Sequence, residues 1–253
     1  MRASAGSTTT AVAAALLGAG AIAFIAVLAL QPTAAQTAPT VSAQSGPLLI
    51  EGKPSGNHVR IRMSANGKRF SIQGNVRGSG PHRCKKRHHG TLLRCPARGV
   101  TAVVVDLGGA GDRLEILESL PVPVTGRMGP GSDKMIGAGE SDFCYPGGAR
   151  RNRCIGGGGD DVCITGPRNS DCVGGPGNDY CEASTGSDGC WGGPGRDICK
   201  MGPGHDGCHG EGGNDHLFGG SSSDKLYGGA GNDYCDGGRG VGRSYTCERG
   251  PRH

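Results

Sequence analysis

The sequence predicts an all-β repeat protein, built from many short stacked units and preceded by a small β-strand module. Two observations point to this fold class. Of the 253 residues, 51 are Gly and only ten are aromatic, which excludes a large apolar core of the conventional kind. From residue 129 onward, Asp recurs every nine residues, and so regular a period indicates stacked units that bury their apolar faces against each other.

The first 43 residues are predicted to direct the chain out of the cytoplasm. Residues 11–30 form an uninterrupted run of small and apolar residues. Such a run is typical of a signal peptide, cleaved here after Ala35 or Ala43, but it is also long enough to be an uncleaved N-terminal membrane anchor. Its richness in Ala and Gly favours cleavage. In either case the remaining chain lies outside the cell, where its twelve cysteines can form disulfides.

Residues 44–127 are predicted to form a β-rich capping module. Apolar and charged residues alternate through 58–63 and again around 70–72, while residues 101–107 form a β-branched run. Gly and Asn turns separate these segments. The sequence DLGGAGD at residues 106–112 already approximates one turn of the repeat that follows, so we expect the module to cover the first repeat.

Residues 128–236 contain twelve nine-residue units, with one inserted residue near Pro146. Asp occupies ten of the twelve equivalent positions, and Asn152 and Ser170 occupy the other two. An apolar residue follows two positions later in each unit and is expected to point inward. These inward residues are Met135, Cys144, Cys154, Cys163, Cys172, Cys181, Cys190, Cys199, Cys208, Leu217, Leu226 and Cys235.

Five units begin with Gly-rich hexamers: GGGGDD (156–161), GGPGND (174–179), GGPGRD (192–197), GEGGND (210–215) and GGAGND (228–233). This pattern resembles the RTX family of hemolysin-type calcium-binding repeats, in a Cys-rich form like those of secreted actinobacterial proteins. The resemblance covers residues 129–236. It implies a right-handed parallel β-roll, in which a six-residue turn binds Ca²⁺, the next three residues form a strand, and two units complete one coil.

The chemistry of the hexamer agrees with calcium binding. Glycine permits close approach of successive backbones, so that carbonyl oxygens converge on a hard cation while the Asp carboxylate supplies negative charge. Calcium would offset part of the acidic excess of this region, and folding is therefore expected to depend on it. A disordered Gly/Asp-rich linker is disfavoured, because low complexity does not enforce a nine-residue phase.

With two units per coil, every second unit stacks on the same edge of the roll. The five Gly-rich hexamers given above then all lie on one edge. On the other edge, Arg or Ser replaces some of the loop glycines. We therefore expect a row of calcium sites on the first edge only. The expected ligand residues are Gly156, Gly158, Asp160, Asp161, Gly174, Pro176, Asn178, Asp179, Gly192, Pro194, Arg196, Asp197, Gly210, Gly212, Asn214, Asp215, Gly228, Ala230, Asn232 and Asp233.

The eight consecutive inward cysteines from Cys144 to Cys208, here called the cysteine ladder, depart from the Leu, Ile or Val usual in the family. They can pair completely along each sheet, or across the roll between neighbours nine or ten residues apart. Stacked strands are near enough but their side chains point the same way, while sheets about 10 Å apart are too distant unless small side chains draw them together. Both pairings stay open, as do free thiols packed as small hydrophobic groups.

Four further cysteines are disulfide candidates: Cys84 with Cys95 around a basic tip, and Cys235 with Cys247 at the C-terminal end. A zinc site is disfavoured because no C-x-x-C occurs in the sequence. His205, His209 and His216 are expected to face solvent rather than bind metal. Residues 237–253 are expected to form a C-terminal cap and a basic tail.

An alternative function is suggested by the charge distribution. Residues 44–100 carry twelve Lys/Arg and one acid, including Arg83, Lys85, Lys86, Arg87, His88 and His89, with Arg60, Arg62, Lys68 and Arg69 nearby. These side chains could bind polyanions such as cell-envelope polymers, although a solvated surface is the plainer interpretation. No aromatic platform accompanies them, so no specific nucleic acid is expected. Membrane contact is expected only through the N-terminal segment.

Catalysis is not predicted. The motifs H-E-x-x-H, G-x-S-x-G and the P-loop are absent from the sequence, which makes a secreted hydrolase the weakest alternative, and no catalytic residue is assigned. The sequence thus predicts an extracellular or envelope-anchored calcium-binding protein of structural type, and leaves its biological role and oligomeric state open.

Overall fold

The computed structural model describes residues 45–79, 82–87, 91–148, 151–240 and 243–250. Its contacts divide the chain into residues 1–40 and 41–253, and the described residues all belong to the second unit. The predicted signal peptide or anchor at residues 1–43 lies outside them. No helix long and apolar enough to cross a membrane is found in the described part of the chain.

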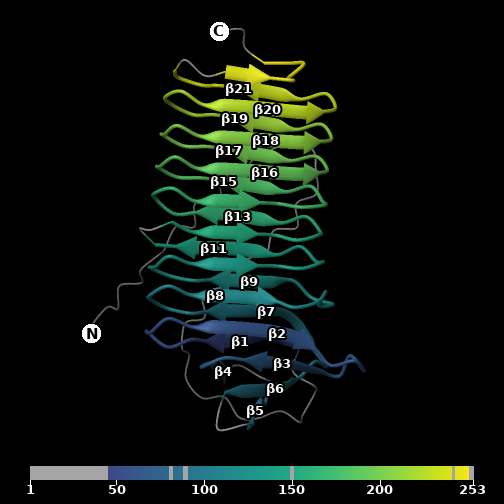
Figure 1. Cartoon of the computed structure of the whole chain (residues 1–253). Coiled ribbons are helices and arrows are strands. Elements are labelled where there is room, and N and C mark those ends of the chain that lie inside the picture. Colours follow the sequence, from purple (N-terminus) through teal and green to yellow (C-terminus); the bar gives the residue numbers. More distant parts are fainter. Residues whose placement is uncertain (1–44, 80–81, 88–90, 149–150, 241–242, 251–253) are drawn as a thin grey trace, which may run out of the picture. The chain divides into compact units, whose positions relative to one another are not determined.

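The second unit consists of two sheets whose strands alternate along the chain, so that each coil contributes one strand to each sheet (Figure 1). The first sheet contains β1 (Gly46–Glu51), β4 (Arg77–Ser79), β7 (Val100–Asp106), β9 (Val124–Arg127), β11 (Phe143–Gly147), β13 (Val162–Thr165), β15 (Tyr180–Glu182), β17 (Ile198–Lys200), β19 (His216–Phe218) and β21 (Tyr234–Asp236). The second sheet contains β2 (His58–Met63), β3 (Arg69–Gln73), β5 (Lys85–Arg87), β6 (Leu92–Pro96), β8 (Arg113–Ile116), β10 (Lys134–Ile136), β12 (Arg153–Ile155), β14 (Asp171–Val173), β16 (Gly189–Pro194), β18 (Gly207–Gly212), β20 (Lys225–Ala230) and β22 (Arg243–Tyr245).

The strand register confirms two units per coil. Cys163 lies beside Cys181, and Cys181 beside Cys199, in parallel strand pairs that are two repeat units apart. Where the extra residue occurs, Cys144 still pairs with Cys163, and the register shifts immediately after Cys144. All twelve predicted inward residues are buried. The all-β parallel roll is therefore confirmed.

The predicted capping module is confirmed as β structure. Strands β3, β6 and β5 extend the second sheet antiparallel from β2, and β4 lies antiparallel to β1 in the first sheet. Strands β1, β7 and β9, and β2 and β8, are already parallel, so both sheets continue from the cap into the roll. Cys84 and Cys95 form the expected disulfide. It links the residue just before β5 to β6, the antiparallel partner of β5.

The core of the roll is narrow because its inward side chains are small. The Cα atoms of Cys144 and Cys154 are 6.2 Å apart across the roll, and those of Cys190 and Cys199 are 6.4 Å apart. Typical face-to-face sheets lie about 10 Å apart. This closeness allows both pairs to form disulfides across the roll, while the described residues show none along a sheet. Cys163, Cys172, Cys181 and Cys208 are buried thiols, so the pairing of the cysteine ladder is incomplete.

Candidate metal centre

Ten of the twelve nine-residue units place a buried Asp at the end of their loop, immediately before a strand, and the other two place the buried Asn152 and Ser170 there. On the edge that leads into the first sheet, here called the first edge, each Asp Oδ1 accepts the backbone N–H of the residue at the equivalent position one coil earlier. The series of donor and acceptor residues is Val124 to Asp142 (2.9 Å), Asp142 to Asp161 (2.7 Å), Asp161 to Asp179 (2.7 Å), Asp179 to Asp197 (2.7 Å), Asp197 to Asp215 (2.8 Å) and Asp215 to Asp233 (2.9 Å).

The second edge, which leads into the second sheet, carries the same arrangement. It begins in the cap, where the N–H and the side-chain Nδ2 of Asn57 both donate to Asp112 Oδ1 at 2.6 and 2.9 Å. The N–H of Asp188 donates to Asp206 Oδ1 at 2.7 Å, and that of Asp206 to Asp224 Oδ1 at 3.0 Å. Asn152 and Ser170 replace two carboxylates of the second edge and interrupt its series. The second-edge loops that end at Asp188, Asp206 and Asp224 keep the same carboxylate arrangement as the first edge.

The second carboxylate oxygen of these residues has no hydrogen-bond partner among the described residues, although it is buried. This holds for Oδ2 of Asp112, Asp133, Asp161, Asp179, Asp188, Asp197, Asp206, Asp215, Asp224 and Asp233. An unpaired buried carboxylate is costly, and such groups usually bind a cation or become protonated. The row of orphaned oxygens is thus the strongest structural sign of a cation-binding site.

Burial raises the pKa of loop carboxyl groups on both edges, including those of Asp161, Asp197 and Asp206. The pKa of Asp161 rises to about 8, mainly through loss of solvation and also through the neighbouring Asp179 and Asp142 carboxylates. Loss of solvation also raises the pKa of Asp197 to about 7 and that of Asp206 to about 7. A bound cation would remove this penalty by pairing with the ionised form.

The glycine at the start of each first-edge hexamer leaves room for the orphaned oxygen. A Cβ on Gly192 would collide with Asp197 Oδ2, and equivalent collisions would occur at Gly156, Gly174, Gly210 and Gly228. The glycine at the fourth position is required by its backbone: Gly195 has φ 150°, and a Cβ there would collide with the carbonyl oxygen of Gly177 one coil earlier. Each loop is therefore a glycine-walled cradle around one carboxylate oxygen.

The loops stack through contacts that occupy some of the predicted ligand positions. The carbonyl oxygens of Pro176 and Pro194, at the third position, accept the N–H of Gly159 and Gly177, both at 2.9 Å. At the fifth position, the N–H of Arg196 donates to Asn178 Oδ1 at 2.9 Å. The carbonyls that face the next coil include those of second- and fourth-position glycines, which the sequence analysis did not single out.

The donor set fits a hard cation. All groups that converge in these loops are carboxylate or carbonyl oxygens, which Ca²⁺ prefers, and neither sulfur nor imidazole is present in the first-edge hexamers. The Asp carboxylates of the five hexamers would supply the charge, and the loop carbonyls would complete the oxygen shell. When bound, the cation would neutralise successive buried carboxylates and so hold adjacent coils together.

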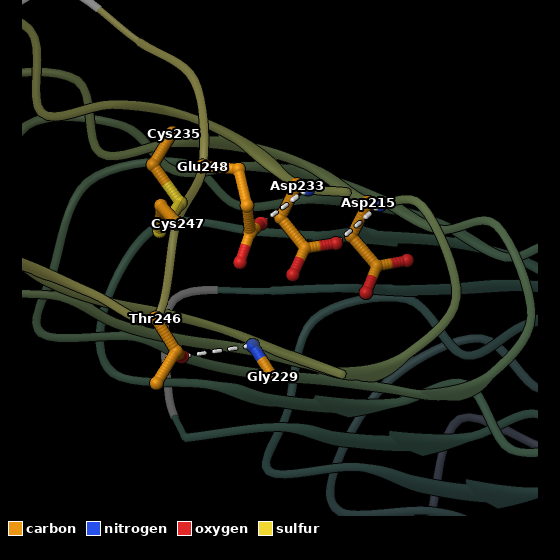
Figure 2. Close-up of a disulfide and its surroundings, with 7 residues drawn as sticks. All are labelled: Asp215, Gly229, Asp233, Cys235, Thr246, Cys247 and Glu248. Carbon is orange, nitrogen blue, oxygen red and sulfur yellow. Dashed lines mark hydrogen bonds between the residues drawn. A yellow bond between two sulfur atoms is a disulfide. The ribbon is translucent and has the colours of Figure 1, made fainter. Parts of the chain in front are cut away.

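The C-terminal end of the first edge is completed by a residue that sequence analysis missed. The N–H of Asp233 donates to Glu248 Oε2 at 2.8 Å, so Glu248 takes the place that the Asp of a further coil would occupy (Figure 2). The expected Cys235–Cys247 disulfide is present and holds this segment against the last coil. Because Glu248 follows Asp233 by less than two full repeat units, the nine-residue grid gives no signal for it.

His209 and His216 lie beside aromatic rings, whereas His205 is exposed in a second-edge loop, with its Nδ1 3.1 Å from the carbonyl oxygen of Ser223. His209 stacks between Trp191 and Tyr227, with ring centroids 6.0 and 4.6 Å away, and His216 meets the edge of Tyr234. The described part of the chain does contain three trios of sulfur atoms, each within 4.8 Å: Cys144, Cys154 and Cys163; Cys163, Cys172 and Cys181; and Cys190, Cys199 and Cys208. A search for C-x-x-C spacing misses these trios, because the roll brings together cysteines 18 residues apart along a sheet and nine or ten residues apart across it.

The fold and the loops together define a parallel β-solenoid of calcium-binding repeats. Residues 173–199 and 209–242 match the model of the RTX calcium-binding nonapeptide repeat in four copies. The chain therefore carries RTX repeats, and RTX nonapeptide repeats bind Ca²⁺. The matched residues include loops of both edges. No curated protein and no solved structure matches the chain.

Proposed function

We propose that the protein is an extracellular calcium-binding protein of structural type, whose ions lie between stacked loops along the first edge. The observation that carries calcium binding is the row of buried Asp Oδ2 atoms without hydrogen-bond partners among the described residues, and the glycines that enclose these atoms in all five first-edge hexamers support the choice of edge. In this division of the chain, residues 44–127 cap the roll, 128–236 bind calcium and 237–253 close its end.

The proposed ligands are the twenty first-edge residues named from the sequence, with Asp161, Asp179, Asp197, Asp215 and Asp233 supplying the charge. The loops of the two edges support this asymmetry. At the fourth loop position the first edge has glycine in all five hexamers. The second edge has glycine there in two hexamers, at Gly186 and Gly204, but has Arg168 with φ 82° and Ser222 with φ 88° in two others. A side chain in this left-handed region stores strain.

The test of the proposal is a calcium-loaded crystal of the full-length protein, examined by anomalous scattering. We expect ordered calcium peaks between consecutive first-edge loops from Gly156 to Asp233, and weak or absent peaks on the second edge. Equal peaks on both edges would refute the asymmetry, and no peaks at saturating calcium would refute the function itself.

Several other features support an extracellular structural role. Four disulfides indicate an oxidising compartment, and the apolar segment at 11–30 supports export by a cleaved signal peptide or an anchor. We assign no catalytic residue. Retention in the membrane fraction after expression in a secreting bacterial host would indicate an anchor, whereas a mature N-terminus at Gln36 or Gln44 would indicate cleavage.

A second candidate function is polyanion binding by the cap, which one surface hollow supports. This hollow is lined by Arg69, Arg83, Lys85, Arg87 and Arg94 together with Pro96. Lys85 lies directly opposite Arg94 in the antiparallel register, so their like charges lie close together, which only an anion or solvent can offset. No Asp or Glu occurs between residues 52 and 105. His88 and His89, also predicted for this surface, lie outside the described residues.

Binding of the full-length protein to immobilised heparin would test this second function. We expect salt-sensitive retention that is lost in the variant Lys85→Gln/Arg87→Gln and kept in the control Lys225→Gln, whose side chain is exposed on the roll. Absence of retention at low salt would remove this function.

A further inference from the structure

The two disulfides within the cysteine ladder start from different sheets. The Cys144–Cys154 bridge joins a strand of the first sheet to the following strand of the second sheet, β11 to β12. The Cys190–Cys199 bridge joins a strand of the second sheet to the following strand of the first, β16 to β17. As a result, three thiols lie between the bridges and the single thiol of Cys208 lies beyond them.

This arrangement cannot be oxidised completely by adding bridges. The three intervening thiols, Cys163, Cys172 and Cys181, can form only one disulfide among themselves. Cys208 has a ladder neighbour on one side only, Cys199, which is already bonded to Cys190. Two thiols would therefore persist in a compartment that favours disulfides.

Shifting one bridge removes this mismatch. The Sγ atoms of Cys190, Cys199 and Cys208 all lie within 4.8 Å of one another, so Cys208 is next to the bond it would have to attack. If the bridge moves to Cys199–Cys208, then Cys190 becomes free. Four consecutive thiols, Cys163, Cys172, Cys181 and Cys190, then remain, and an even number of neighbours can pair completely.

We propose that Cys208 is a resolving cysteine, which shifts the Cys190–Cys199 disulfide and leads to one disulfide in each of four successive coils. The Cys208 thiolate attacks Cys199 Sγ, the Cys199–Cys208 bond forms, and Cys190 leaves as a thiolate that takes up a proton. This step conserves the number of disulfides. Cys163 with Cys172, and Cys181 with Cys190, are then each oxidised by one small-molecule disulfide, which is reduced to two thiols.

The same exchange at the other end of the ladder would leave a cysteine without a partner. Cys163 also lies within 4.8 Å of the Cys144–Cys154 bridge and could attack Cys154. That attack would free Cys144, whose preceding inward neighbour is Met135, so Cys144 would have no partner. Complete pairing is therefore reached only when the exchange starts from Cys208, because the cysteine that it releases, Cys190, has the free thiol of Cys181 as its neighbour.

The exchange requires the roll to open. Cys208 is fully buried, and burial raises the pKa of its thiol well above the usual range, which disfavours the attacking thiolate. We therefore expect the bridge to shift during folding or in partly unfolded molecules.

The test is disulfide mapping of full-length protein refolded from the reduced state with calcium and a glutathione redox buffer. An Asp, Arg or Lys lies between every two neighbouring ladder cysteines, so proteolysis followed by mass spectrometry can assign each bridge. We expect no free thiol in the ladder and four bridges: Cys144–Cys154, Cys163–Cys172, Cys181–Cys190 and Cys199–Cys208. A Cys190–Cys199 bridge with alkylated Cys181 and Cys208 at the end point would overturn the proposal, as would any bridge along a sheet.

The double variant Cys181→Ser/Cys208→Ser is the matched control. It removes Cys208 and one of the three thiols between the bridges, so the six remaining ladder cysteines can pair completely without a shift. In this variant we expect Cys190–Cys199 to persist together with Cys163–Cys172. If Cys190 and Cys199 were instead unpaired there, pairing between neighbours across the roll would not govern the ladder and the proposal would fail.

Discussion

The backbone N–H of Asp179 donates to Oδ1 of Asp197 at 2.7 Å, while Oδ2 of Asp197 has no partner among the described residues although it is buried. One carboxylate therefore has two roles. Its first oxygen links a coil to the coil before it, and its second oxygen is available to a cation. This division explains why the same Asp recurs on both edges, including loops that lack a full set of glycines.

Replacing Asp197 with Asn should separate these two roles. Asn keeps an oxygen that can accept the Asp179 N–H but loses the charge, so the fold should persist while calcium affinity falls roughly tenfold or more, because ligand charge sets the affinity of such sites. Asp206→Asn is the matched control on the second edge, since the Asp206 carboxyl accepts the same kind of hydrogen bond and also has a pKa of about 7. Calcium titration by calorimetry should detect the loss in Asp197→Asn only. An equal loss in both variants would contradict a first-edge site.

Glycine substitutions should distinguish the required loop positions from permissive ones. Gly195→Ala places a methyl group against the Gly177 carbonyl at φ 150°, and we expect a loss of about 2 to 4 kcal/mol in the free energy of unfolding. Gly207→Ala is the control, because a Cβ there has nothing within 4 Å. Urea unfolding in calcium should show a change of less than about 1 kcal/mol for the control. Similar stability of the two variants would show that the loops do not stack as described.

The stability of the calcium-free roll should fall as pH rises. The folded pKa values of Asp179, Asp197 and Asp161, about 6, 7 and 8, are above the ordinary value of 3.8. Their contribution is therefore fully present below about pH 4 and is lost as the pH rises through 6 to 8. Melting temperatures in chelator should be higher at pH 5 than at pH 8.

Calcium should reverse that pH dependence, because the ion binds the ionised carboxylates and releases protons. Calcium affinity is therefore expected to rise between pH 6 and pH 8, with proton release measurable by calorimetry in buffers of different ionisation enthalpy. Unchanged affinity over this range would contradict binding by the buried carboxylates.

The C-terminal closure should contribute to stability through two separate contacts. Removing the Cys235–Cys247 disulfide, which closes a loop with a sequence separation of 12, should cost about 3 kcal/mol by the loop-entropy argument. Glu248→Gln should cost less, about 1 kcal/mol, because its amide oxygen still accepts the Asp233 N–H. Hydrogen exchange should show faster opening of β21 in the disulfide variant. Exchange that increases first near β1 would instead locate the weakest end in the cap.

Most of the roll could be predicted from sequence because its period is imposed by geometry. A nine-residue phase with one inward residue per unit fixes both the strands and the edge on which each Asp lies, and Asp112 continues that order into the cap. Glu248 could not be predicted, because it reaches the last coil from a segment outside the period. The pairing within the cysteine ladder also could not be predicted, since it depends on how closely the small core lets the sheets approach.

The orientation of the loop carbonyls could be predicted less completely than the fold. Asp positions follow from the period, but which carbonyls face the next coil depends on loop backbone angles such as those at Gly177 and Gly195. The ligand positions predicted from the sequence are the first, third, fifth and sixth of each hexamer. They therefore leave out the second- and fourth-position carbonyls. Only the stacked loops show that these oxygens approach the following coil.

The central claim is that calcium ions hold successive coils together through the buried carboxylates. The most direct measurement is far-ultraviolet circular dichroism of the reduced full-length protein at pH 8 as calcium is added to and removed from it, because reduction removes the disulfides that would otherwise hold the coils. The account predicts a β spectrum that appears with calcium, disappears with chelator and is not restored by magnesium. A β spectrum that is the same in calcium and in chelator, with no calcium bound at equilibrium dialysis, would contradict it.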